Sequence, residues 1–553
     1  MKRVSFIVSI MMAFVLVVSG CSSKSKNNEG QSSPASSGAS SPAASDTGEQ
    51  MVGNMYTTGL PIAQNKEEIT IMIQGGGFDP NEWAAYKKLE EETNIHINWE
   101  IIPWGQFDEK KNLMFASGDY PDVIAGWGLT NTEVMKYGPK GVFLPIEDSI
   151  DKYAPNIRKM FDEVQGSRDI LTTPDGHIYT LPLAWKQPNT GVVTHINQKW
   201  LDKLHLQMPT TTDELYQVLK AFKEQDPNGN GKKDEIPLGF LSYTTPAESN
   251  QSELGMFGYF GRVDTKEHLV LENGKVVYTA MHDEWLNAVK FLRKLYKEGL
   301  IDPEVFTHNL QQYQAKGEQE PPVYGVVASW DGWGGVGEKN FPQYVPFLPV
   351  KGPGVENPAW LSGDPSIFPT QFVITSAGKA KKDLIIRWMD HIWFNASEKG
   401  PGELYFGPEG KGWEKTADGK WKVLYPEKAD WGPISGFPIY YPFNLEDNYY
   451  LDPQKNQYHK NVTLQKLYAP YVSEELTNFR WHLWLTPEQQ EQASTLQTDI
   501  KKATDDFYAK CVIGEGDIDS GYEKFKQELT RMGVDKLVDI YQAAVDASKW
   551  AHK

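Results

Sequence analysis

The stretch ITIMIQGGGFDPNEWAAYKKLEEETNIHINWEII, residues 69–102, decides the fold of this chain. It opens with the apolar run Ile69–Ile73 and closes with the alternating run Ile95–Ile102, and each run is typical of a β-strand. Between them, Asp79 and Pro80 mark the start of a helix. A strand, a helix and a second strand form a parallel pair joined by a crossover. We therefore predict an α/β fold.

Two later helices carry equally clear signals. Thr211 and Glu214 form a capping box before an apolar face that ends at Phe222. A second helical pattern runs over 285–296 and stops at Gly299. The chain has 553 residues, more than one hydrophobic core usually supports, so we expect two lobes.

The N-terminus has the pattern of a bacterial lipoprotein leader. A basic start precedes an apolar run over 4–18, which is too short for a spanning helix, and Ser19-Gly20-Cys21 follows. This ending resembles a lipobox, so we expect a signal peptide over 1–20 and a lipid, palmitate included, on Cys21. Cys511 is the only other cysteine, which excludes a disulfide framework and suggests an inert buried thiol.

Residues 21–64 are rich in Ser, Ala, Pro, Gly and Asn and contain few bulky apolar side chains. Such a segment cannot bury enough surface to offset its ordering entropy, so we expect a flexible tether. No further run of about 20 apolar residues follows. These features predict a globular body held at the extracellular face of the cell membrane by its lipid anchor alone.

Charge and motifs exclude several function classes. The formal net charge is −18, which argues against nucleic acid or an anionic membrane surface as a partner. The glycines at 75–77 follow a strand, but neither Gly-Lys-Ser/Thr nor GxGxxG spacing is present. We therefore expect no nucleotide binding by this chain.

The sharpest local motif is DPNGNGKKDE, residues 226–235. Oxygen ligands at alternate positions of a tight turn, with glycine at the sixth, are what Ca²⁺ requires of a short loop. Pro237 stands at the twelfth position, where an EF-hand has a bidentate Glu, so carboxylates at the ninth and tenth positions must complete the shell. The alternative is a surface turn with incidental charge. The expected ligands of a structural calcium ion are Asp226, Asn228, Asn230, the carbonyl of Lys232, Asp234 and Glu235.

Several separate segments resemble one family, the extracellular solute-binding lipoproteins of carbohydrate ABC importers, and in particular its large, calcium-containing branch of alginate-binding and oligosaccharide-binding proteins. These segments are residues 115–123, 175–182, 197–204 with the calcium loop that follows, and 514–533. The calcium ligands match that branch position by position, Pro237 included. The resemblance covers most of the chain beyond the tether.

The resemblance implies a two-lobed, periplasmic-binding-protein-like fold with hinge crossovers and a ligand cleft between the lobes. It also implies partners, namely ABC permease subunits with their ATPase and an oligosaccharide ligand, and we expect a monomer. Closure of the lobes around ligand would signal to the permease. The expected segments are a first lobe at 65–190 and 321–400, and a second lobe at 191–320 and 401–553.

The ligand residues should be aromatic, because sugars present apolar C–H faces for stacking and hydroxyl rims for polar side chains. Glycine-rich loops and strand ends that carry Trp are therefore candidates, although one indole of the pair at 330 and 333 could pack inward. The predicted ligand residues are Trp127, Trp185, Trp330, Asp331, Trp333, Trp360 and Tyr441. Tyr440, Tyr441, Trp481 and Trp484 could equally build an interface between lobes, and Trp285, Trp388 and Trp393 lie on helical stripes typical of a core.

Two rivals remain open. A cleft rich in Trp and acids would also suit a glycoside hydrolase, but no acid pair is singled out by spacing, and no nucleophile elbow or metal-ligand cluster appears. A peptide or another non-sugar solute would fit the same fold. We therefore predict a binding protein without enzymatic activity that captures an oligosaccharide.

Overall fold

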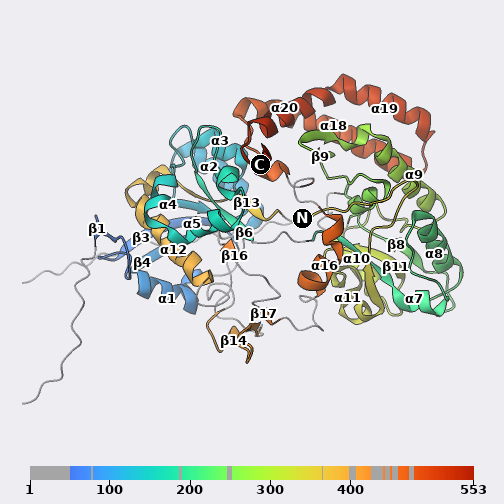
Figure 1. Ribbon diagram of the computed structural model, residues 1–553, viewed down its shortest axis with the longest axis horizontal. Coiled ribbons are helices and arrows are strands. Elements are labelled where there is room, and N and C mark those ends of the chain that lie inside the picture. The colour runs from blue at the N-terminus through green and yellow to red at the C-terminus, as the bar shows by residue number, and fades with distance from the viewer. Residues whose placement is uncertain are drawn as a thin grey trace, which may run out of the picture. The chain divides into compact units, whose positions relative to one another are not determined.

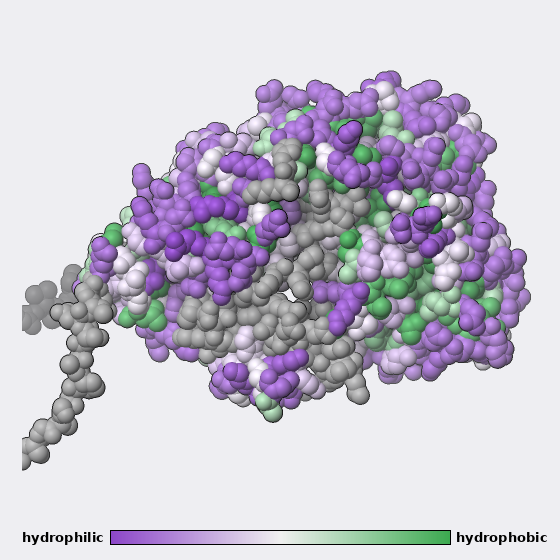
Figure 2. All heavy atoms as spheres, in the orientation of Figure 1, coloured by the Kyte–Doolittle hydropathy of each residue, from purple (hydrophilic) through white to green (hydrophobic). Residues whose placement is uncertain are grey.

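The computed structural model describes residues 50–552, except for 76–78, 186–189, 246–251, 364, 398–406, 425–439, 442–448, 451–458, 473–476 and 478. Cys21, the leader and most of the expected tether lie outside the described residues. Among those described, no helix is both long and apolar enough to cross a membrane. Hydrophilic side chains cover most of the described surface in the view of Figure 2, as is usual for a surface that faces water.

The first lobe is built on a six-stranded sheet in the order β16-β6-β13-β5-β3-β4. Strands β3 and β4 are parallel over their whole length, from Glu67 opposite Ile95 to Gln74 opposite Ile102, which confirms the predicted pair. Strand β13 runs antiparallel to both of its neighbours. The strands are β3 (Glu67–Gln74), β4 (Ile95–Ile102), β5 (Val123–Ala125), β6 (Thr180–Trp185), β13 (Ile367–Ile374) and β16 (Tyr440–Tyr441).

Helices cover this sheet, and the crossover helix α1 begins later than the sequence suggested. Asp79 caps a short 3₁₀ turn at Pro80–Glu82, and α1 starts only at Ala84. Trp388 and Trp393 of α12 are buried in the core of this lobe, as predicted. The helices are α1 (Ala84–Thr93), α2 (Phe107–Ser117), α3 (Asn131–Tyr137), α4 (Glu147–Tyr153), α5 (Pro155–Glu163), α6 (Ser167–Leu171) and α12 (Lys382–Ser397).

The second lobe has a four-stranded sheet in the order β12-β7-β11-β8. Its strands are β7 (Val193–Asn197), β8 (Ile236–Gly239), β11 (Tyr324–Ser329) and β12 (Tyr344–Phe347). Strand β11 pairs with both β7 and β8, because it is an all-buried strand that needs a neighbour on each side. The segment 321–400, expected to return to the first lobe as a whole, is thus divided: β11 and β12 lie in the second sheet, and only β13 lies in the first.

The helices around the second sheet include both that the sequence signalled. Helix α8 carries the predicted capping box between Thr211 and Glu214, and Trp285 of α9 is buried as expected. The helices are α7 (Gln198–Lys203), α8 (Thr212–Glu224), α9 (Asp283–Lys297), α10 (Leu310–Gly317) and α11 (Trp333–Asn340). A hairpin of β9 (Leu269–Glu272) and β10 (Lys275–Tyr278) precedes α9. Shorter elements are β1 (Met51–Val52), β2 (Met55–Tyr56), β14 (Trp413–Lys415), β15 (Trp421–Val423), β17 (Tyr449–Tyr450) and α16 (Gln465–Tyr468).

Three closing helices pack on the second lobe, drawn in red in Figure 1. They are α18 (Pro487–Ile513), α19 (Ile518–Met532) and α20 (Val534–Ala547). Helix α18 contacts α9, α19 and α20, and α20 contacts β10. Thr486 and Gln489 form a capping box at the start of α18, and Gly514 ends it in the left-handed conformation.

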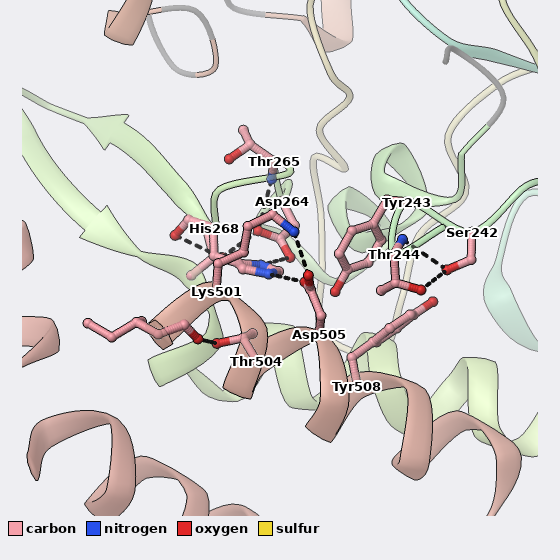
Figure 3. A network of polar contacts seen from close by, with 12 residues as sticks. Ser242, Tyr243, Thr244, Asp264, Thr265, His268, Lys501, Thr504, Asp505 and Tyr508 are labelled. Carbon is pink, nitrogen blue, oxygen red and sulfur yellow. Dashed lines mark hydrogen bonds and ion pairs between the residues drawn. The ribbon is translucent and has the colours of Figure 1, made fainter. Parts of the chain in front are cut away.

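A buried charge network holds α18 against the second lobe (Figure 3). His268 donates from Nδ1 to Asp264 (2.8 Å) and faces Asp505 of α18 with Nε2 (3.3 Å). Trp285 donates its indole N–H to the same Asp264 carboxylate (2.8 Å). His268 is fully buried, and burial alone would lower its pKa, but Asp264 and Asp505 outweigh burial and raise the pKa to about 9. The imidazolium form is therefore part of the folded structure.

We expect His268→Gln to lower the free energy of unfolding by about 3–5 kcal/mol near pH 6, because the fully buried Asp264 carboxylate loses its cation, whereas Asp505 keeps its ion pair with Lys501 (2.5 Å). A folded-state pKa raised to about 9 from the ordinary 6.5 gives stability that is complete below pH 6.5 and is lost as pH rises through 9. The stability difference between wild type and variant in urea unfolding should therefore shrink over this window. Burial raises the pKa of Glu253 to about 7, but this group titrates alike in wild type and variant. Its contribution to stability therefore cancels in the difference. Lys502→Gln, at an exposed pair on α18, is the control and should show no such trend.

Candidate functional site

Three indoles surround Phe368 at one edge of the first sheet. Strands β5 and β6 end at this edge, and the antiparallel β13 begins there. The ring centroids of Trp127, Trp185 and Trp481 lie 4.9, 5.7 and 5.5 Å from that of Phe368. Trp127 is 37% exposed and Trp481 is 53% exposed, so both present an apolar face to solvent. In α/β folds, ligands bind beyond the carboxyl ends of parallel strands, which is where this cluster lies.

A cavity of about 460 Å³ lies beside the cluster. The first lobe supplies part of its wall, and the segment 479–485, α18, α20 and the turn before β9 supply the rest. Asn131 of α3 joins the two sides by donating from Nδ2 to the carbonyls of Trp481 (3.1 Å) and Leu483 (2.9 Å). The residues that line the cavity include Trp127, Asn131, Glu267, Phe368, Gln371, Arg480, Trp481, Gln490, Gln497 and Tyr541.

A second cavity, of about 680 Å³, lies along α18, and Gln497 lines both cavities. Its wall is polar, with Thr498 and Lys501 from α18 facing Thr244 and Phe306 of the second lobe. Both volumes lie within the range of small-molecule sites.

The carboxyl end of β11 carries the second group of predicted residues. Trp330 is 37% exposed, and the Lys460 ammonium lies 4.4 Å from its ring centroid. Asp331 accepts a hydrogen bond from the backbone N–H of Gly334 at 2.8 Å. Trp333 is half-buried against Phe341, and its indole N–H has no hydrogen-bond partner among the described residues. Trp333 is thus the indole of this pair that packs inward, whereas Trp330 is partly exposed to solvent.

A pair of histidines lies beside this loop. His195 of β7 and His459 lie with their Nε2 atoms 2.7 Å apart. Burial lowers the pKa of His195 well below its usual value and that of His459 to about 4, and the adjacent Lys460 adds to both shifts. Both imidazoles are therefore neutral at pH 7, and one donates a hydrogen bond to the other. Sequence reasoning missed this pair because 264 residues separate its members.

Trp360 is a correction, because it was predicted to contact ligand but is only 1% exposed. Its ring packs against Tyr259 and Tyr468, and its indole N–H donates to the carbonyl of Val192 (2.6 Å). Gly255 allows this packing, since a Cβ there would meet the ring at 2.5 Å. Trp360 is therefore a core residue of the second lobe.

Tyr441 is described only by its backbone, which pairs in parallel with Trp185 at the edge of the first sheet. That pairing places the Tyr441 backbone beside Trp185, at the ends of the strands where the indole cluster lies. Trp484 is buried with its indole N–H donated to the carbonyl of Ile170 (2.7 Å), so it packs against the first lobe. Of the undecided aromatic residues whose side chains the structure describes, Trp481 is therefore the one that lines the cavity.

The loop 226–235 is folded into a tight turn around its own oxygens. Asp226 accepts hydrogen bonds from three backbone N–H groups, at residues 229, 230 and 231. Asn228 and Asn230 donate from their amides to Asp234. Gly229 and Gly231 have positive φ angles of 75° and 74°, which explains the need for glycine at both places.

Glu235 shows that this residue set suits a cation. Its Oε1 atom is buried and has no hydrogen-bond partner among the described residues. Burial raises its pKa, and the neighbouring carboxylates of Asp226 and Asp234 raise it further. Three acidic groups and two amide side chains within ten residues form an oxygen-rich set of the kind that binds Ca²⁺, so the residue types fit the predicted ion.

Comparison with known proteins identifies the family. The profile of the family "Bacterial extracellular solute-binding protein" matches residues 78–392, more than half of the chain. The chain belongs to this family. Among relatives of this solute-binding protein is the fructooligosaccharide ABC transporter substrate-binding protein FusA of Streptococcus pneumoniae serotype 4, which is 32% identical over 85% of this chain and 87% of its own length. The polygalacturonan/rhamnogalacturonan-binding protein YtcQ of Bacillus subtilis is 25% identical over 85% of this chain and 89% of its own length.

Solved structures agree with this assignment. The structure of FusA in complex with kestose is 31% identical in sequence, with a TM-score of 0.72. The match covers 88% of this chain and 100% of the FusA chain. The alginate-binding protein AlgQ2 without calcium ion is 22% identical, with a TM-score of 0.63 over 88% of this chain and 99% of its own, and shares the fold. These two-lobed neighbours confirm the predicted fold class and the family resemblance.

The contrast between Trp360 and Trp330 predicts opposite mutational effects. We expect Trp360→Ala to lower the free energy of unfolding by about 3–5 kcal/mol, because it leaves a cavity in the core. Trp330→Ala removes a partly exposed ring and should cost less than about 1 kcal/mol. Urea unfolding of the two variants beside wild type measures both values, and equal losses would contradict the assignment of Trp360 to the core.

Proposed function

We propose that this solute-binding protein is the substrate-binding component of an ABC importer and that it captures an oligosaccharide outside the cell. The observation that carries the proposal is the cluster of Trp127, Trp185 and Trp481 around Phe368 beside an open cavity. Flat indole faces suit the C–H faces of sugar rings. The relatives that are named for fructooligosaccharide and for pectic polymers support the same ligand class.

The cargo we favour is a neutral oligosaccharide, with fructooligosaccharides such as kestose as the first candidates. Within the described part of the chain, the charged residues that line the smaller cavity are Glu267 and Arg480, and they pair with each other at 2.8 Å. A uronic oligosaccharide would need cations that are not already neutralised. The likeness to FusA, a fructooligosaccharide-binding protein, supports the neutral choice.

The remaining parts of the proposal follow from the sequence. The protein is anchored through a lipid on Cys21 at the extracellular face of the membrane, works as a monomer, and delivers its cargo to permease subunits driven by an ATPase. It has no enzymatic activity, in keeping with relatives that are named as binding proteins. Ligand would stabilise a closed arrangement of the lobes, and that arrangement would engage the permease.

Calorimetric titration of residues 22–553 with kestose tests the proposal. We expect binding in wild type and at least about tenfold weaker binding, or about 1.4 kcal/mol, in Trp127→Ala and Trp481→Ala, because each variant loses a stacking face. Leu113→Ala, at an exposed position on α2, is the control and should bind as wild type.

Two outcomes of that titration would overturn the proposal. The first is binding of short peptides with no binding of neutral or uronic oligosaccharides, because the cargo would then not be a sugar. The second is the appearance of cleaved sugar that a single Asp or Glu substitution abolishes, because the protein would then be a hydrolase.

We further propose that Asp226, Asn228, Asn230, the carbonyl of Lys232, Asp234 and Glu235 bind a structural Ca²⁺ ion. The buried, unpartnered Oε1 of Glu235 supports this, as does the crowding of carboxylates around it. The ion would neutralise these carboxylates and brace the turn between α8 and β8. An EF-hand mutant of FusA has been solved, so a loop of that kind is present in a relative.

Chelation should therefore lower the melting temperature, and Ca²⁺ should restore it. A ligand at 100 times its dissociation constant adds about 2.7 kcal/mol of stability, which a thermal scan resolves. Glu235→Gln should reduce this calcium response, whereas Glu224→Gln, at an exposed pair on the preceding helix, should leave it unchanged. A melting temperature that responds to neither chelator nor Ca²⁺ would show that the loop is an ordinary turn.

A further inference from the structure

The loop that joins α9 to α10 carries a second cluster of metal-ligating side chains, distinct from the loop at 226–235. Asp302, Glu304 and His308 each place one ligand atom within 4.8 Å of the others. Asp302 is fully buried, His308 is 3% exposed, and Glu304 lies at the surface. The cluster is therefore a buried site with one side open to solvent.

The tautomer of His308 is set by its surroundings. Nε2 lies 3.1 Å from the backbone carbonyl of Phe240, which can only accept, so Nε2 carries the proton. Nδ1 is buried and has no hydrogen-bond partner among the described residues. It lies 3.7 Å from Oδ2 of Asp302, beyond hydrogen-bond distance. A lone pair thus points toward a carboxylate, which is unfavourable unless a cation lies between them.

The same arrangement is the one that metal-binding histidines adopt. Such a histidine donates its second ring N–H to a backbone carbonyl, which fixes the ring and turns the other nitrogen toward the metal. Phe240 supplies that carbonyl here. Tyr324 also donates to Asp302 (3.2 Å), so the buried carboxylate has a supporting partner of its own.

Lys316 is the cation that currently balances the two carboxylates. Its ammonium lies 2.9 Å from both oxygens of Asp302 and 2.5 Å from Glu304. One positive charge against two negative ones leaves the cluster with an excess negative charge. A divalent ion in place of the ammonium would neutralise the cluster, and the Lys316 side chain, which is 22% exposed, has a route to solvent.

We propose that Asp302, Glu304 and Nδ1 of His308 form a binding site for a divalent transition metal ion, with Zn²⁺ the best match, that competes with Lys316. One imidazole and two carboxylates leave a fourth tetrahedral position open for water. The imidazole favours Zn²⁺ over Ca²⁺ and Mg²⁺, which take oxygen ligands. The site is independent of the proposed sugar binding and of the calcium loop.

The position of the site gives it a structural role. Phe306 belongs to the same loop and lines the larger cavity on α18. The carbonyl of Val305 accepts the backbone N–H of Ser242 (3.2 Å), which ties the loop to the end of β8. A metal ion across Asp302 and His308 would therefore brace the wall of the cavity that contains Thr244 and Phe306.

Zn²⁺ titration of residues 22–553, purified without a histidine tag and held in saturating Ca²⁺, tests the site. Calorimetry and thermal scans should show one bound Zn²⁺ and a raised melting temperature in wild type. We expect at least tenfold weaker binding in Glu304→Gln and in His308→Gln, and at least tenfold tighter binding in Lys316→Met, which removes the competing ammonium. His177→Gln is the matched control, because His177 pairs with Glu147 at the surface (2.6 Å), and it should bind as wild type.

Co²⁺ provides a second readout that does not depend on stability. Its visible absorption reports nitrogen coordination, so the band expected in wild type should be lost in His308→Gln and kept in His177→Gln. Glu304→Gln lies at the surface and keeps the test valid if the buried His308 variant does not fold. The proposal is overturned if Zn²⁺ leaves the wild-type melting temperature unchanged, or if Glu304→Gln and Lys316→Met both bind Zn²⁺ as wild type does.

Discussion

The rest of the structure depends on how α18 is held, and the holding interaction is the His268 imidazolium between Asp264 and Asp505. The imidazolium is fully buried, where an unpaired ion would be costly. The two carboxylates must therefore lie beside it in the folded second lobe. Because α18 begins directly after the segment 479–485, fixing the helix also fixes that segment. Trp481 and Arg480 thus reach the cavity through a contact made elsewhere in the molecule.

The candidate site is assembled from segments that are distant in the chain. The loop after β5, the start of β13, the segment 479–485 and α18 all reach one cavity, and Asn131 of α3 bonds to Trp481 and Leu483. A site that draws on both lobes can sense ligand through their relative position, whereas a pocket within one lobe cannot.

Two carboxylate pairs of the second lobe, each with one fully buried member, have a cation between them. His268 serves Asp264 and Asp505, and Lys316 serves Asp302 and Glu304. At the loop 226–235, Glu235 is buried beside two further acids, and burial with their charge raises its pKa. The chain is acidic overall, and its buried carboxylates stay ionised only where a positive partner is close.

The sequence by itself determined the elements whose signals are local: the parallel pair of β3 and β4, the capping box of α8, and the buried indoles of α9 and α12. The sequence also carried the family resemblance, because the family's segments occur in it in the same order. Only the tertiary structure decided that β11 and β12 join the second sheet, that Trp360 is core, and that His195 meets His459. The physical reason is that the local sequence around an indole in a glycine-rich loop is the same whether the ring is buried in the core or faces a ligand. Which face it buries depends on residues such as Tyr259 and Tyr468 that lie far away in the chain.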